Sequence, residues 1–445
     1  MGYILSLALV LRLIFINQSL WLDESIEALA LMGRMGPLMT YALADYQPPL
    51  YHLIGWVNTQ LFGYSEVALR IPSLISGLLT VFFVVKIGEL VASKKVGIIA
   101  GFLAATNPLL IYYSVEGRTY SMTAFFVTAS FYYFIKLLKS TTYDLPRGKA
   151  GLRPKILYLL FTTAFIYTSY LSWFALLAQG LYALYKKRFD LVALQFVSAL
   201  TLLAWLPSFI SSLSIGQSTR SNSPEWGRVV GGLEWKSLPL TWVKFNIGRL
   251  GFENKTLYAG IVSALGLFHL YILKRLDYKK YSIFFLWIVP PILLGLFTAY
   301  FLPVYSYFRL LFVLPAYLLL LALSSLKLSK YIIYLNFIFL VIFLYSPRYH
   351  KEDWRSLMQD LPAGSVVAMP SRAQSAPLLY YGWTGDIIEP SHEELTGGKV
   401  YYVRYVEDLF DVSKLGQANF RDSGYTITKQ RVYPGIQMDI YEKKH

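Results

Sequence analysis

Cysteine is absent from the sequence, and charged residues are scarce. Only 15% of the 445 residues are Asp, Glu, Lys or Arg, whereas 56% are hydrophobic. The lack of cysteine excludes disulfide scaffolds, cysteine-ligated zinc or iron–sulfur sites and thiol catalysis. Soluble globular proteins carry about 25% charged residues. The chain therefore has too few charges to cover a water-exposed surface, and an ordinary soluble enzyme is excluded.

Negative charge is especially scarce in the first three quarters of the chain. Residues 1–346 hold 29 Lys and Arg against 13 Asp and Glu, whereas residues 347–445 hold 12 against 13. We therefore expect a basic membrane part followed by a near-neutral, water-soluble domain. Nucleic-acid binding is one reason for a basic chain. Here the positive charges lie between long apolar runs, where membrane topology explains them, so no nucleic-acid partner is expected.

The long apolar runs predict a polytopic α-helical membrane protein with about eleven transmembrane helices. A hydrocarbon core about 30 Å thick needs about 20 apolar residues in a helix. The expected spans cover residues 2–20, 68–91, 95–113, 119–138, 156–169, 170–185, 191–210, 256–273, 281–300, 307–325 and 331–346. We divide the long run at 156–185 near its polar residues 167–170. A single tilted helix there would reverse the orientation of everything downstream.

The distribution of Lys and Arg favours eleven spans with a cytoplasmic N-terminus. This count places 17 basic residues in five cytoplasmic loops, as the positive-inside rule requires. With ten spans, the later basic clusters would lie outside the membrane. The first run lacks a small-residue cleavage site, so we expect it to be a retained helix of a multi-pass cell membrane protein.

The predicted transmembrane domain, residues 1–346, includes long extracytoplasmic loops at 21–67 and 211–255. The first loop has semi-apolar stretches that predict interfacial helices. The second interleaves aromatic residues with Lys and Arg, which is typical of a lid near lipid headgroups. Residues 347–445 alternate helix and strand patterns and predict a small extracytoplasmic α/β domain. We expect this domain to contact a partner or substrate, or to support folding.

Two adjacent carboxylates, Asp23 and Glu24, directly follow the first span. One interpretation is that they cap the next helix, since acidic side chains stabilise a helix N-terminus. In the catalytic interpretation, Asp23 is a general base that takes a proton from an acceptor hydroxyl, while Glu24 positions it or a donor group. We favour the catalytic interpretation.

A second polar cluster surrounds the prolines at 48 and 49. Proline fixes its own φ and restricts the residue before it, so Gln47 is expected to be extended. One of the prolines then starts a helix, with His52 in the first turn. Tyr46 precedes this element. A functional cluster and a plain proline-initiated helix with a structural histidine both fit the pattern.

The other polar candidates lie at the outer ends of later spans. Glu116 and Arg118 either pair with each other, which is worth about 0–1 kcal/mol at a surface, or Arg118 binds a phosphate through its planar guanidinium. Tyr120 follows them in sequence. Arg309 follows Tyr307 at the start of an apolar span. A charge there is costly and indicates function, although snorkelling to lipid headgroups also explains it.

The ordered set of these motifs resembles the C-type (GT-C) glycosyltransferase superfamily. Within it, the closest likeness is to the branch of protein O-mannosyltransferases and lipid A aminoarabinose transferases. The motifs that carry the resemblance are the acidic pair at 23–24, Gln-Pro-Pro-Leu at 47–50, Ala-Leu-Arg-Ile-Pro-Ser at 68–73, Tyr-Ser-Val-Glu-Gly-Arg-Thr-Tyr at 113–120, Tyr-Phe-Arg-Leu-Leu at 307–311 and Asp-Trp-Arg at 353–355.

The resemblance implies an inverting transfer of one sugar from a polyprenyl-phosphate or dolichyl-phosphate donor. The acceptor is then a protein, a lipid-linked glycan or a lipid on the outer membrane face. Asp23 would activate the acceptor, and Arg118 and Arg309 would bind the phosphate near Glu116. Gln47 occupies a position where relatives often have His or Lys. No cofactor is required, while a divalent metal on Glu24 or His52 is compatible with the sequence.

Two other functional classes are less well supported. An oligosaccharyltransferase would carry a Trp-Trp-Asp-Tyr-Gly signature, which is absent here. A transporter of a lipid-linked or anionic solute is the main alternative. Such transporters place polar groups at mid-membrane in broken helices and tend to contain internal repeats. The ionisable residues here lie at the outer rim instead, which favours an enzyme.

Overall fold

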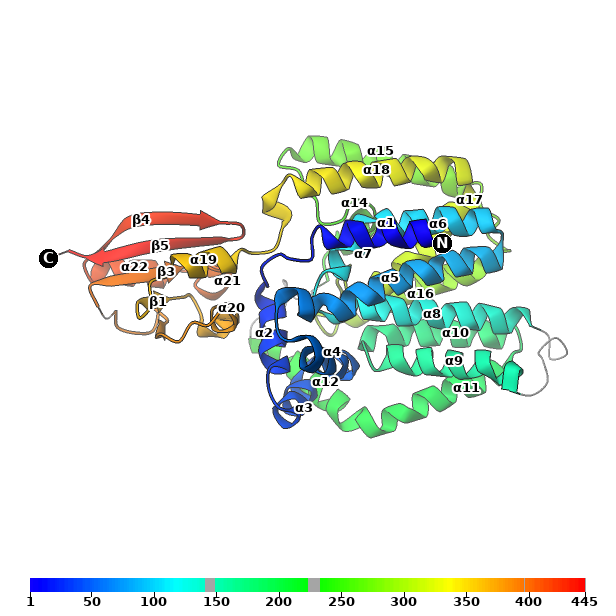
Figure 1. Cartoon of the computed structure of the whole chain (residues 1–445), viewed down its shortest axis with the longest axis horizontal. Coiled ribbons are helices and arrows are strands. Elements are labelled where there is room, and N and C mark those ends of the chain that lie inside the picture. The colour runs from blue at the N-terminus through cyan, green and yellow to red at the C-terminus, as the bar shows by residue number, and fades with distance from the viewer. Residues whose placement is uncertain (141–148, 223–232, 396, 445) are drawn as a thin grey trace. The chain divides into compact units, whose positions relative to one another are not determined.

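A computed structural model describes residues 1–140, 149–222, 233–395 and 397–444 and divides the chain into two compact units (Figure 1). The helical unit comprises Met1–Ile16, Met35–Gly63 and Val67–Ile342. The C-terminal unit comprises Asn17–Arg34, Tyr64–Glu66 and Phe343–His445. The second unit thus combines the expected soluble domain with two segments that the sequence analysis assigns to the first extracytoplasmic loop.

Helices occupy all eleven positions at which spans are expected. In the helical unit they are α1 (Gly2–Leu13), α3 (Met35–Ala44), α4 (Leu50–Phe62), α5 (Glu66–Val91), α6 (Lys94–Thr106), α7 (Pro108–Ser114), α8 (Thr119–Lys139), α9 (Lys149–Ile166), α10 (Trp173–Tyr185), α11 (Phe189–Leu200), α12 (Leu206–Asn222), α14 (Ser237–Ile247), α15 (Lys255–Leu273), α16 (Ser282–Ala299), α17 (Leu314–Ser324) and α18 (Leu326–Leu344). The helices expected in the first loop are present as α3 and α4. Of the second loop, Trp226 and Arg228 lie outside the described residues.

Six described helical segments are long and apolar enough to cross a membrane by themselves. They are Glu66–Val91, Thr119–Lys139, Phe189–Ser214, Lys255–Leu273, Ser282–Ala299 and Leu326–Leu344. The count rises to seven if α6 and α7 form one bent span. Other expected spans correspond to shorter apolar helices, such as α1 and Leu311–Ser324. The chain is therefore a polytopic helical membrane protein.

The predicted division of the run at 156–185 is confirmed. Helix α9 ends at Ile166, a short 3₁₀ turn covers Tyr170–Ser172, and α10 begins at Trp173. The hydroxyl of Ser172 donates to the carbonyl oxygens of Phe165 (2.7 Å) and Ser169 (2.6 Å), which stabilises the turn. Helices α9 and α10 consequently lie next to each other in the helix layer that also contains α8 and α11 (Figure 1).

The expected span at 95–113 is bent in the structure rather than continuous. Helix α6 ends at Thr106 and α7 begins at Pro108, with an angle of 61° between them. Proline has no backbone N–H to continue the ladder of the preceding helix. The side chain of Asn107 accepts hydrogen bonds from the backbone N–H groups of Leu109 and Leu110, both at 3.0 Å, and so caps α7. The bend changes the direction of the chain just before residues 116–120.

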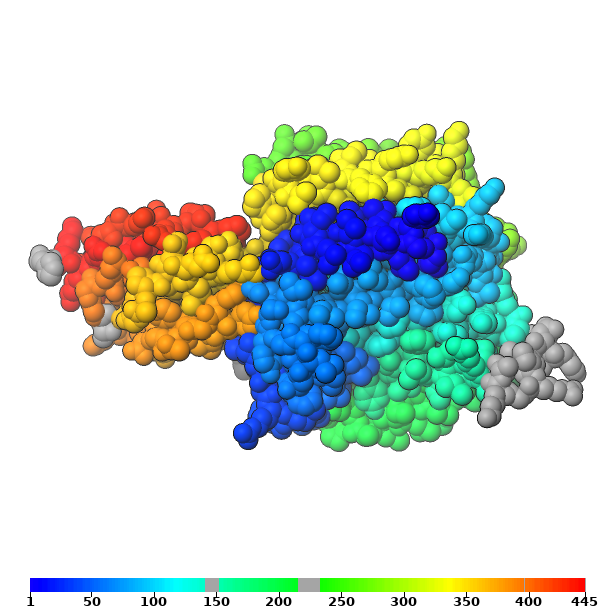
Figure 2. All heavy atoms as spheres, viewed as in Figure 1, coloured from blue at the N-terminus to red at the C-terminus, as the bar shows by residue number. Residues whose placement is uncertain are grey.

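Helix α1 lies on the visible face of the helical unit (Figure 2) and packs on α6 and α7. Its basic residue, Arg12, is fully buried. The guanidinium donates to the carbonyl oxygen of Ala8 at 2.9 Å and to that of Ala105 at 3.3 Å. Arg12 therefore links the first helix to the end of α6 close to the bend.

The C-terminal unit is built on a mixed five-stranded sheet with the order β2-β1-β3-β5-β4. The strands are β1 (Val366–Ala368), β2 (Ile387–Ile388), β3 (Lys399–Val403), β4 (Tyr425–Tyr433) and β5 (Ile436–Lys443). Strand β1 pairs in parallel with β2 and β3, whereas β5 pairs antiparallel with β3 and β4. Alternate side chains enter two buried clusters, one on each face, as the twofold periodicity of a strand requires.

Helices of the C-terminal unit are α2 (Leu22–Leu31), α19 (Trp354–Asp360), α20 (Ala376–Tyr380), α21 (Glu407–Phe410) and α22 (Leu415–Asp422). The expected mixture of helices and strands is present, and a helix expected near residues 409–415 is divided between α21 and α22. The chain breaks there because the Asp411 carboxylate accepts hydrogen bonds from the backbone N–H groups of Leu415 and Gly416, both at 2.8 Å. Asp411 therefore ends one helical segment and caps the next.

Candidate functional site

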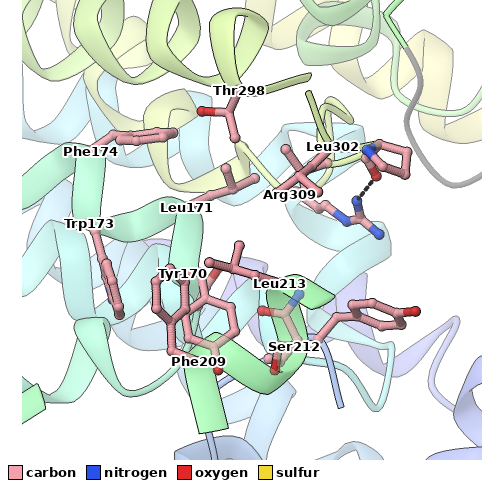
Figure 3. Close-up of a pocket in the computed structure, with 15 residues that line it drawn as sticks. Tyr170, Leu171, Trp173, Phe174, Phe209, Ser212, Leu213, Thr298, Leu302 and Arg309 are labelled. Atoms are coloured by element: carbon pink, nitrogen blue, oxygen red, sulfur yellow. Dashed lines mark hydrogen bonds between the residues drawn. The ribbon is translucent and has the colours of Figure 1, made fainter. Parts of the chain in front are cut away.

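The helical unit contains a cavity of about 310 Å³ (Figure 3). Most of its lining is aromatic or aliphatic and consists of Tyr170, Leu171, Trp173, Phe174, Phe209, Leu213, Leu302, Pro303 and Val304. Its polar lining consists of Tyr46, Gln47, Ser169, Ser212, Thr298 and Arg309. Cavities of this size and mostly apolar character suit small organic ligands. The mixed lining favours an amphiphilic ligand, with one polar and one apolar part.

The break between α9 and α10 supplies the aromatic wall of the cavity. Tyr170 lies on the 3₁₀ turn and Trp173 begins α10, while Phe209 comes from α12. The ring centre of Phe209 lies 5.0 Å from that of Tyr170 and 4.9 Å from that of Trp173. Figure 3 shows these three rings grouped on one side of the cavity, away from Arg309. The turn and the first residues of α10 thus place several neighbouring aromatic and aliphatic side chains in one wall of the cavity.

Gln47 and Arg309 give the cavity its polar end. The Arg309 guanidinium donates to the carbonyl oxygen of Pro303 at 3.1 Å and is half-buried (Figure 3). The Oε1 atom of Gln47 is buried, and no hydrogen-bond donor within the described residues reaches it. An unsatisfied buried acceptor costs about 1–3 kcal/mol. A ligand hydroxyl at this position would satisfy it, while Arg309 supplies positive charge for an anion.

An Asp45–His52 pair lies beside this polar end. The Oδ2 atom of Asp45 is 3.1 Å from Nε2 of His52, and the two side chains are 14% and 1% exposed. Ser212, which lines the cavity, donates its hydroxyl to the backbone oxygen of Asp45 at 3.1 Å. Burial raises the pKa of Asp45, but the hydrogen bond with His52 and the charge of Arg118 outweigh it, so the net shift is downward. Asp45 therefore stays ionised at neutral pH.

Sequence reasoning gave Asp45 no role beyond a topological marker and treated His52 as an isolated candidate. The pairing depends on the turn between α3 and α4, which brings residue 45 back to residue 52. One signal was available, since Asp45 directly precedes Tyr46 and Gln47. An acid next to a proline-initiated helix with a histidine in its first turn is a plausible ion pair.

Glu116 and Tyr120 belong to a separate buried aromatic cluster in the helical unit. Glu116 is 1% exposed. The Tyr120 ring lies 5.2 Å from Tyr113 and 5.0 Å from Phe308, measured between ring centres. Tyr307 packs on Phe308 at 5.3 Å. The predicted motifs at 113–120 and 307–311 are therefore brought together, although they are almost 200 residues apart in the sequence.

Arg249 is a cation that sequence reasoning did not single out. Its guanidinium lies 4.8 Å from the ring centre of Tyr112. The nearby tyrosine hydroxyls of residues 112, 113 and 307, together with Glu116, favour the charged form and raise the pKa of Arg249, although burial opposes this. The side chain nevertheless remains exposed to solvent. An exposed arginine among aromatic groups is well suited to bind a phosphate.

The backbone around Gly248 explains how Arg249 reaches this cluster. Gly248 has a φ of +67°, and a Cβ atom built on it would lie 2.8 Å from Pro108. Only glycine permits this left-handed turn at such close approach. The side-chain amide of Asn107 also donates to the carbonyl oxygen of Phe245 at 2.8 Å. The segment after α14 is thus attached to the start of α7.

Lys244 adds a second cation to this segment. Its Nζ atom donates to the carbonyl oxygen of Leu250 at 3.0 Å. Burial and the positive charge of Arg249 lower the pKa of Lys244 to about 8. Lys244 is therefore only partly protonated slightly above neutral pH, whereas Arg249 carries a permanent charge.

Arg118 interacts both with the loop that carries Glu116 and with the Asp45–His52 pair. Its backbone N–H donates to the carbonyl oxygen of Glu116 at 2.8 Å, and its own carbonyl accepts the hydroxyl of Ser73 at 3.2 Å. Its charge contributes to the lowered pKa of Asp45. Arg118 thus connects the loop at 116–118 electrostatically with the Asp45–His52 pair.

Asp23 and Glu24 belong to the C-terminal unit, in the first turn of α2. The N-cap residue is Trp21, so neither carboxylate caps the helix through its side chain. Glu24 is buried and accepts a hydrogen bond from the Lys351 ammonium at 2.8 Å, with both side chains 1% exposed. Asp23 contributes, after burial and Glu352, to the raised pKa of Tyr405.

The two residues expected as metal ligands have other partners. Glu24 binds Lys351 in the C-terminal unit, and His52 binds Asp45 in the helical unit. Within the part of the chain that the structure describes, no three His, Asp or Glu side chains gather in a group able to hold a metal ion. These residues therefore do not fit a shared metal site within either unit, and we derive no step through a metal.

Eight of the ten predicted residues fall into three groups, whereas His52 pairs with Asp45 and Arg118 lies in the loop at 116–118. Tyr46, Gln47 and Arg309 line the cavity. The second group, which lies among aromatic rings, is formed by Glu116, Tyr120 and Tyr307, with Arg249 added by the structure. The third group is the acidic pair of α2.

Residues 46–214 match the model of a family described as dolichyl-phosphate-mannose-protein mannosyltransferase. This segment contains the cavity residues from α4 to α12, the Asp45 neighbours Tyr46 and Gln47, and the 113–120 motif. No curated protein sequence matches the chain.

Solved structures show the same fold at low sequence identity. The ArnT protein of Cupriavidus metallidurans in its apo state matches with a TM-score of 0.57 and 10% identity, over 99% of this chain and 97% of that one. The same protein bound to undecaprenyl phosphate matches with a TM-score of 0.57 and 12% identity over the same shares. The archaeal oligosaccharyltransferase AglB of Archaeoglobus fulgidus, in complex with an inhibitory peptide and a dolichol-phosphate, matches with a TM-score of 0.54 and 13% identity, over 98% of this chain and 74% of that one.

Proposed function

We propose that the chain is a membrane glycosyltransferase, because residues 46–214 match the model of the dolichyl-phosphate-mannose-protein mannosyltransferase family. It transfers one sugar, with inversion, from a polyprenyl-phosphate donor to an acceptor hydroxyl on the outer membrane face. The acceptor is a protein, a lipid-linked glycan or a lipid. The family match supports the glycosyltransferase predicted from the sequence, and its donor, stereochemistry and acceptor are part of the same proposal.

The amphiphilic cavity of the helical unit is the observation that carries this proposal. A polyprenyl-phosphate sugar has an apolar chain, an anionic phosphate and a sugar rich in hydroxyl groups. The aromatic wall at 170–174 and 209 suits the first isoprene units, and Arg309 suits the phosphate. The free acceptor atom of Gln47 suits a sugar hydroxyl. The bound undecaprenyl phosphate of the similar ArnT structure agrees with a ligand of this class.

Arg249 and Arg118 extend the proposed donor site beyond the cavity. Gln47 supplies no charge, so the phosphate must be compensated by other cations. Arg309 lines the cavity, and Tyr307, two residues earlier, lies in the electrostatic environment of Arg249. We assign Arg118, Arg249 and Arg309 to the donor phosphate, and Glu116 to favouring the charged form of Arg249.

The proposed reaction is a single displacement at the anomeric carbon. The acceptor oxygen forms a bond to that carbon, while the bond from the carbon to the phosphate oxygen breaks. The electron pair of the broken bond leaves on the polyprenyl phosphate, and Asp23 takes the hydroxyl proton. Attack opposite the leaving group inverts the anomeric configuration. Arginines placed where the negative charge develops lower the barrier more than mobile water would.

The proposed reaction needs no metal ion, because the leaving group is a phosphate that arginines stabilise. Activity that survives exhaustive treatment with a chelator would support this assignment. Activity that is lost with the chelator and restored by one divalent cation would contradict it.

We propose eleven membrane crossings with the C-terminal unit outside the cytoplasm. Eleven helical positions and the 17 basic residues of five loops support this arrangement. A cysteine introduced at Ser371 would then react with a membrane-impermeant maleimide on intact cells. Labelling only after lysis would contradict the crossing number.

The function is tested by substituting Asp23. Purified full-length protein in liposomes would receive a radiolabelled polyprenyl-phosphate sugar, with membrane proteins and membrane lipids as separate acceptor pools. We expect Asp23→Asn to lower the transfer rate about 10²–10⁴-fold, the usual contribution of a general base. Asp408→Asn, which changes an exposed carboxylate of the same unit, is the matched control and should retain activity.

Two results would refute the proposal. Wild-type transfer by Asp23→Asn would remove this residue from the mechanism. Flux of the labelled lipid across the membrane without any sugar transfer by the wild-type protein would instead favour the transporter alternative. Label in only one acceptor pool would identify the acceptor class.

A further inference from the structure

The helix that carries Asp23 forms part of the core of the C-terminal unit. Leu22 is 5% exposed and belongs to the same buried cluster as Trp354, Leu357 and Trp383. Trp21 packs against this cluster from the N-terminal side of α2. The first turn of α2 is therefore held by side chains more than 300 residues later in the sequence.

The backbone that leads into α2 is hydrogen-bonded to α19 and α20. The backbone N–H of Leu20 donates to the Tyr381 hydroxyl at 2.9 Å, and Ser19 Oγ lies 3.0 Å from the same oxygen. Ser19 Oγ also accepts the backbone N–H of Arg355 at 3.2 Å. These contacts fix residues 19 and 20 directly before the acidic pair.

Arg355 and Tyr381 in turn meet at a third segment. The Oε1 atom of Glu66 accepts hydrogen bonds from the Arg355 guanidinium at 2.7 and 3.1 Å and from the Tyr381 hydroxyl at 3.0 Å. The Tyr380 hydroxyl donates to the carbonyl oxygen of Tyr64 at 2.6 Å. One polar network thus joins residues 19–20, residues 64–66 and the start of the soluble domain.

The buried ion pair between Lys351 and Glu24 is the strongest link. Both side chains are 1% exposed, and their charged atoms are 2.8 Å apart. A buried ion pair is weak evidence for stability, because desolvation offsets much of the attraction. What such a buried ion pair provides instead is one fixed orientation of the two side chains. Lys351 holds Glu24 in one orientation, and Asp23 is the neighbouring residue on the same helical turn.

We propose that the C-terminal unit positions the general base: Lys351, through Glu24, and Tyr381, through residues 19 and 20, hold the first turn of α2 so that the Asp23 carboxylate has one orientation. These are positioning residues, because neither needs to touch a substrate. This inference rests on the proposed role of Asp23. Under this proposal, the C-terminal unit influences the rate of the chemical step by orienting Asp23.

The test separates the chemical step from donor binding. Lys351→Met removes the charge, and Tyr381→Phe removes only one hydroxyl while keeping the packing. We expect each variant to lower kcat about 10-fold or more, because misplacement of a catalytic group by about 1 Å costs up to about 10²-fold. The KM for the polyprenyl-phosphate sugar should stay within about twofold of wild type. Lys351→Arg, which keeps the charge, should recover part of the lost kcat.

Arg372→Met is the matched control, because it breaks an exposed ion pair with Glu393 in the same unit. It should leave kcat and KM unchanged. If Lys351→Met elutes as an aggregate, Tyr381→Phe decides the matter. Wild-type kcat in a folded Tyr381→Phe or Lys351→Met variant, with Asp23→Asn inactive, would overturn the inference and leave the proposed function intact. An active Asp23→Asn would instead refute the proposed function itself.

Discussion

The helical unit and the C-terminal unit carry opposite kinds of chemistry. Arg309 lines the cavity of the helical unit and Arg249 lies at its aromatic cluster, whereas α2 of the C-terminal unit carries two adjacent carboxylates. The sequence shows a related contrast, with excess positive charge before residue 347 and near neutrality after it. This contrast matches the proposed function, in which arginines of the helical unit bind the anionic donor and Asp23 of the C-terminal unit activates the acceptor.

This division predicts distinct kinetic effects for the two units. Loss of a donor-binding group should raise the donor KM, whereas loss of a group that positions or forms the base should lower kcat. Variants of the helical unit test the donor-binding half of this comparison, whereas Asp23→Asn and Lys351→Met test the half that concerns kcat.

Arg309→Ala and Arg249→Ala should have the largest effects on donor binding. A hydrogen bond to a charged group contributes about 1.5–3 kcal/mol, which corresponds to about a 10–100-fold change in affinity. We expect each variant to raise the donor KM by this factor. Arg275→Ala, which changes an exposed arginine outside both clusters, should leave the KM unchanged. If the donor KM of Arg309→Ala and Arg249→Ala equals that of the Arg275→Ala control, Arg249 and Arg309 do not bind the donor.

Asp45→Asn should destabilise the helical unit by about 1–3 kcal/mol, since the substitution removes the negative charge that His52 contacts. The folded-state pKa of Asp45 is lowered, so its stabilising effect is fully present above pH 3.8 and is lost as the pH falls through the folded-state pKa. Thermal unfolding of wild type and variant at several pH values measures this. The gap between their melting temperatures should persist at pH 7 and close in strong acid.

Asp277→Asn is the control for this comparison, since Asp277 is exposed and accepts a hydrogen bond from Lys280. It should shift the melting temperature little. A stability difference for Asp45→Asn that grows as the pH is lowered would show that Asp45 is protonated in the folded protein.

Gln47→Lys should strengthen donor binding, because it adds a cation at the polar end of the cavity. Near a protein surface such a charge is worth about 1 kcal/mol, so we expect the donor KM to fall about two- to tenfold. The effect should weaken at high salt, which screens partly exposed charges. Gln47→Met is the matched uncharged control. An unchanged KM in Gln47→Lys would place the donor phosphate away from residue 47.

The smallest expected effect concerns the ionisation of Lys244. Its pKa is lowered to about 8 by burial and by the positive charge of Arg249. In Arg249→Ala the pKa should rise, because one cause of the shift is removed. Competitive acetylation followed by mass spectrometry at a series of pH values measures the reactivity of Lys244, with exposed Lys274 as internal reference. An identical titration in both proteins would show that residues 244 and 249 do not interact.

Much of the helical architecture could be predicted because its signals are local. The polar residues 167–170 interrupt an apolar run, and the helix breaks there as predicted. The bend at Asn107 was missed, because Pro108 lies inside an apolar run long enough to read as one span. The signal was present, since an asparagine before a proline is a common start of a helix.

The candidate site was less predictable than the helices. Asp45 is a candidate because it pairs with His52, seven residues away across a turn. Arg249 is a candidate because it lies over the ring of Tyr112, more than 100 residues earlier in the sequence. Neither pairing has a sequence spacing that predicts it. The assignment of α2 was also beyond sequence reasoning, because Leu22 packs against Trp354 through a core that forms only when both ends of the chain meet.

The sequence by itself determined that this protein is a helical membrane protein with a small C-terminal domain of helices and strands, because span length, strand alternation and the scarcity of charge are properties of short segments. Tertiary structure alone decided which polar groups meet. It joined Glu24 to Lys351, Asp45 to His52 and Arg249 to Tyr112. The physical reason is that hydrogen bonds, ion pairs and ring contacts act over a few ångströms, and the path of the whole chain sets those distances.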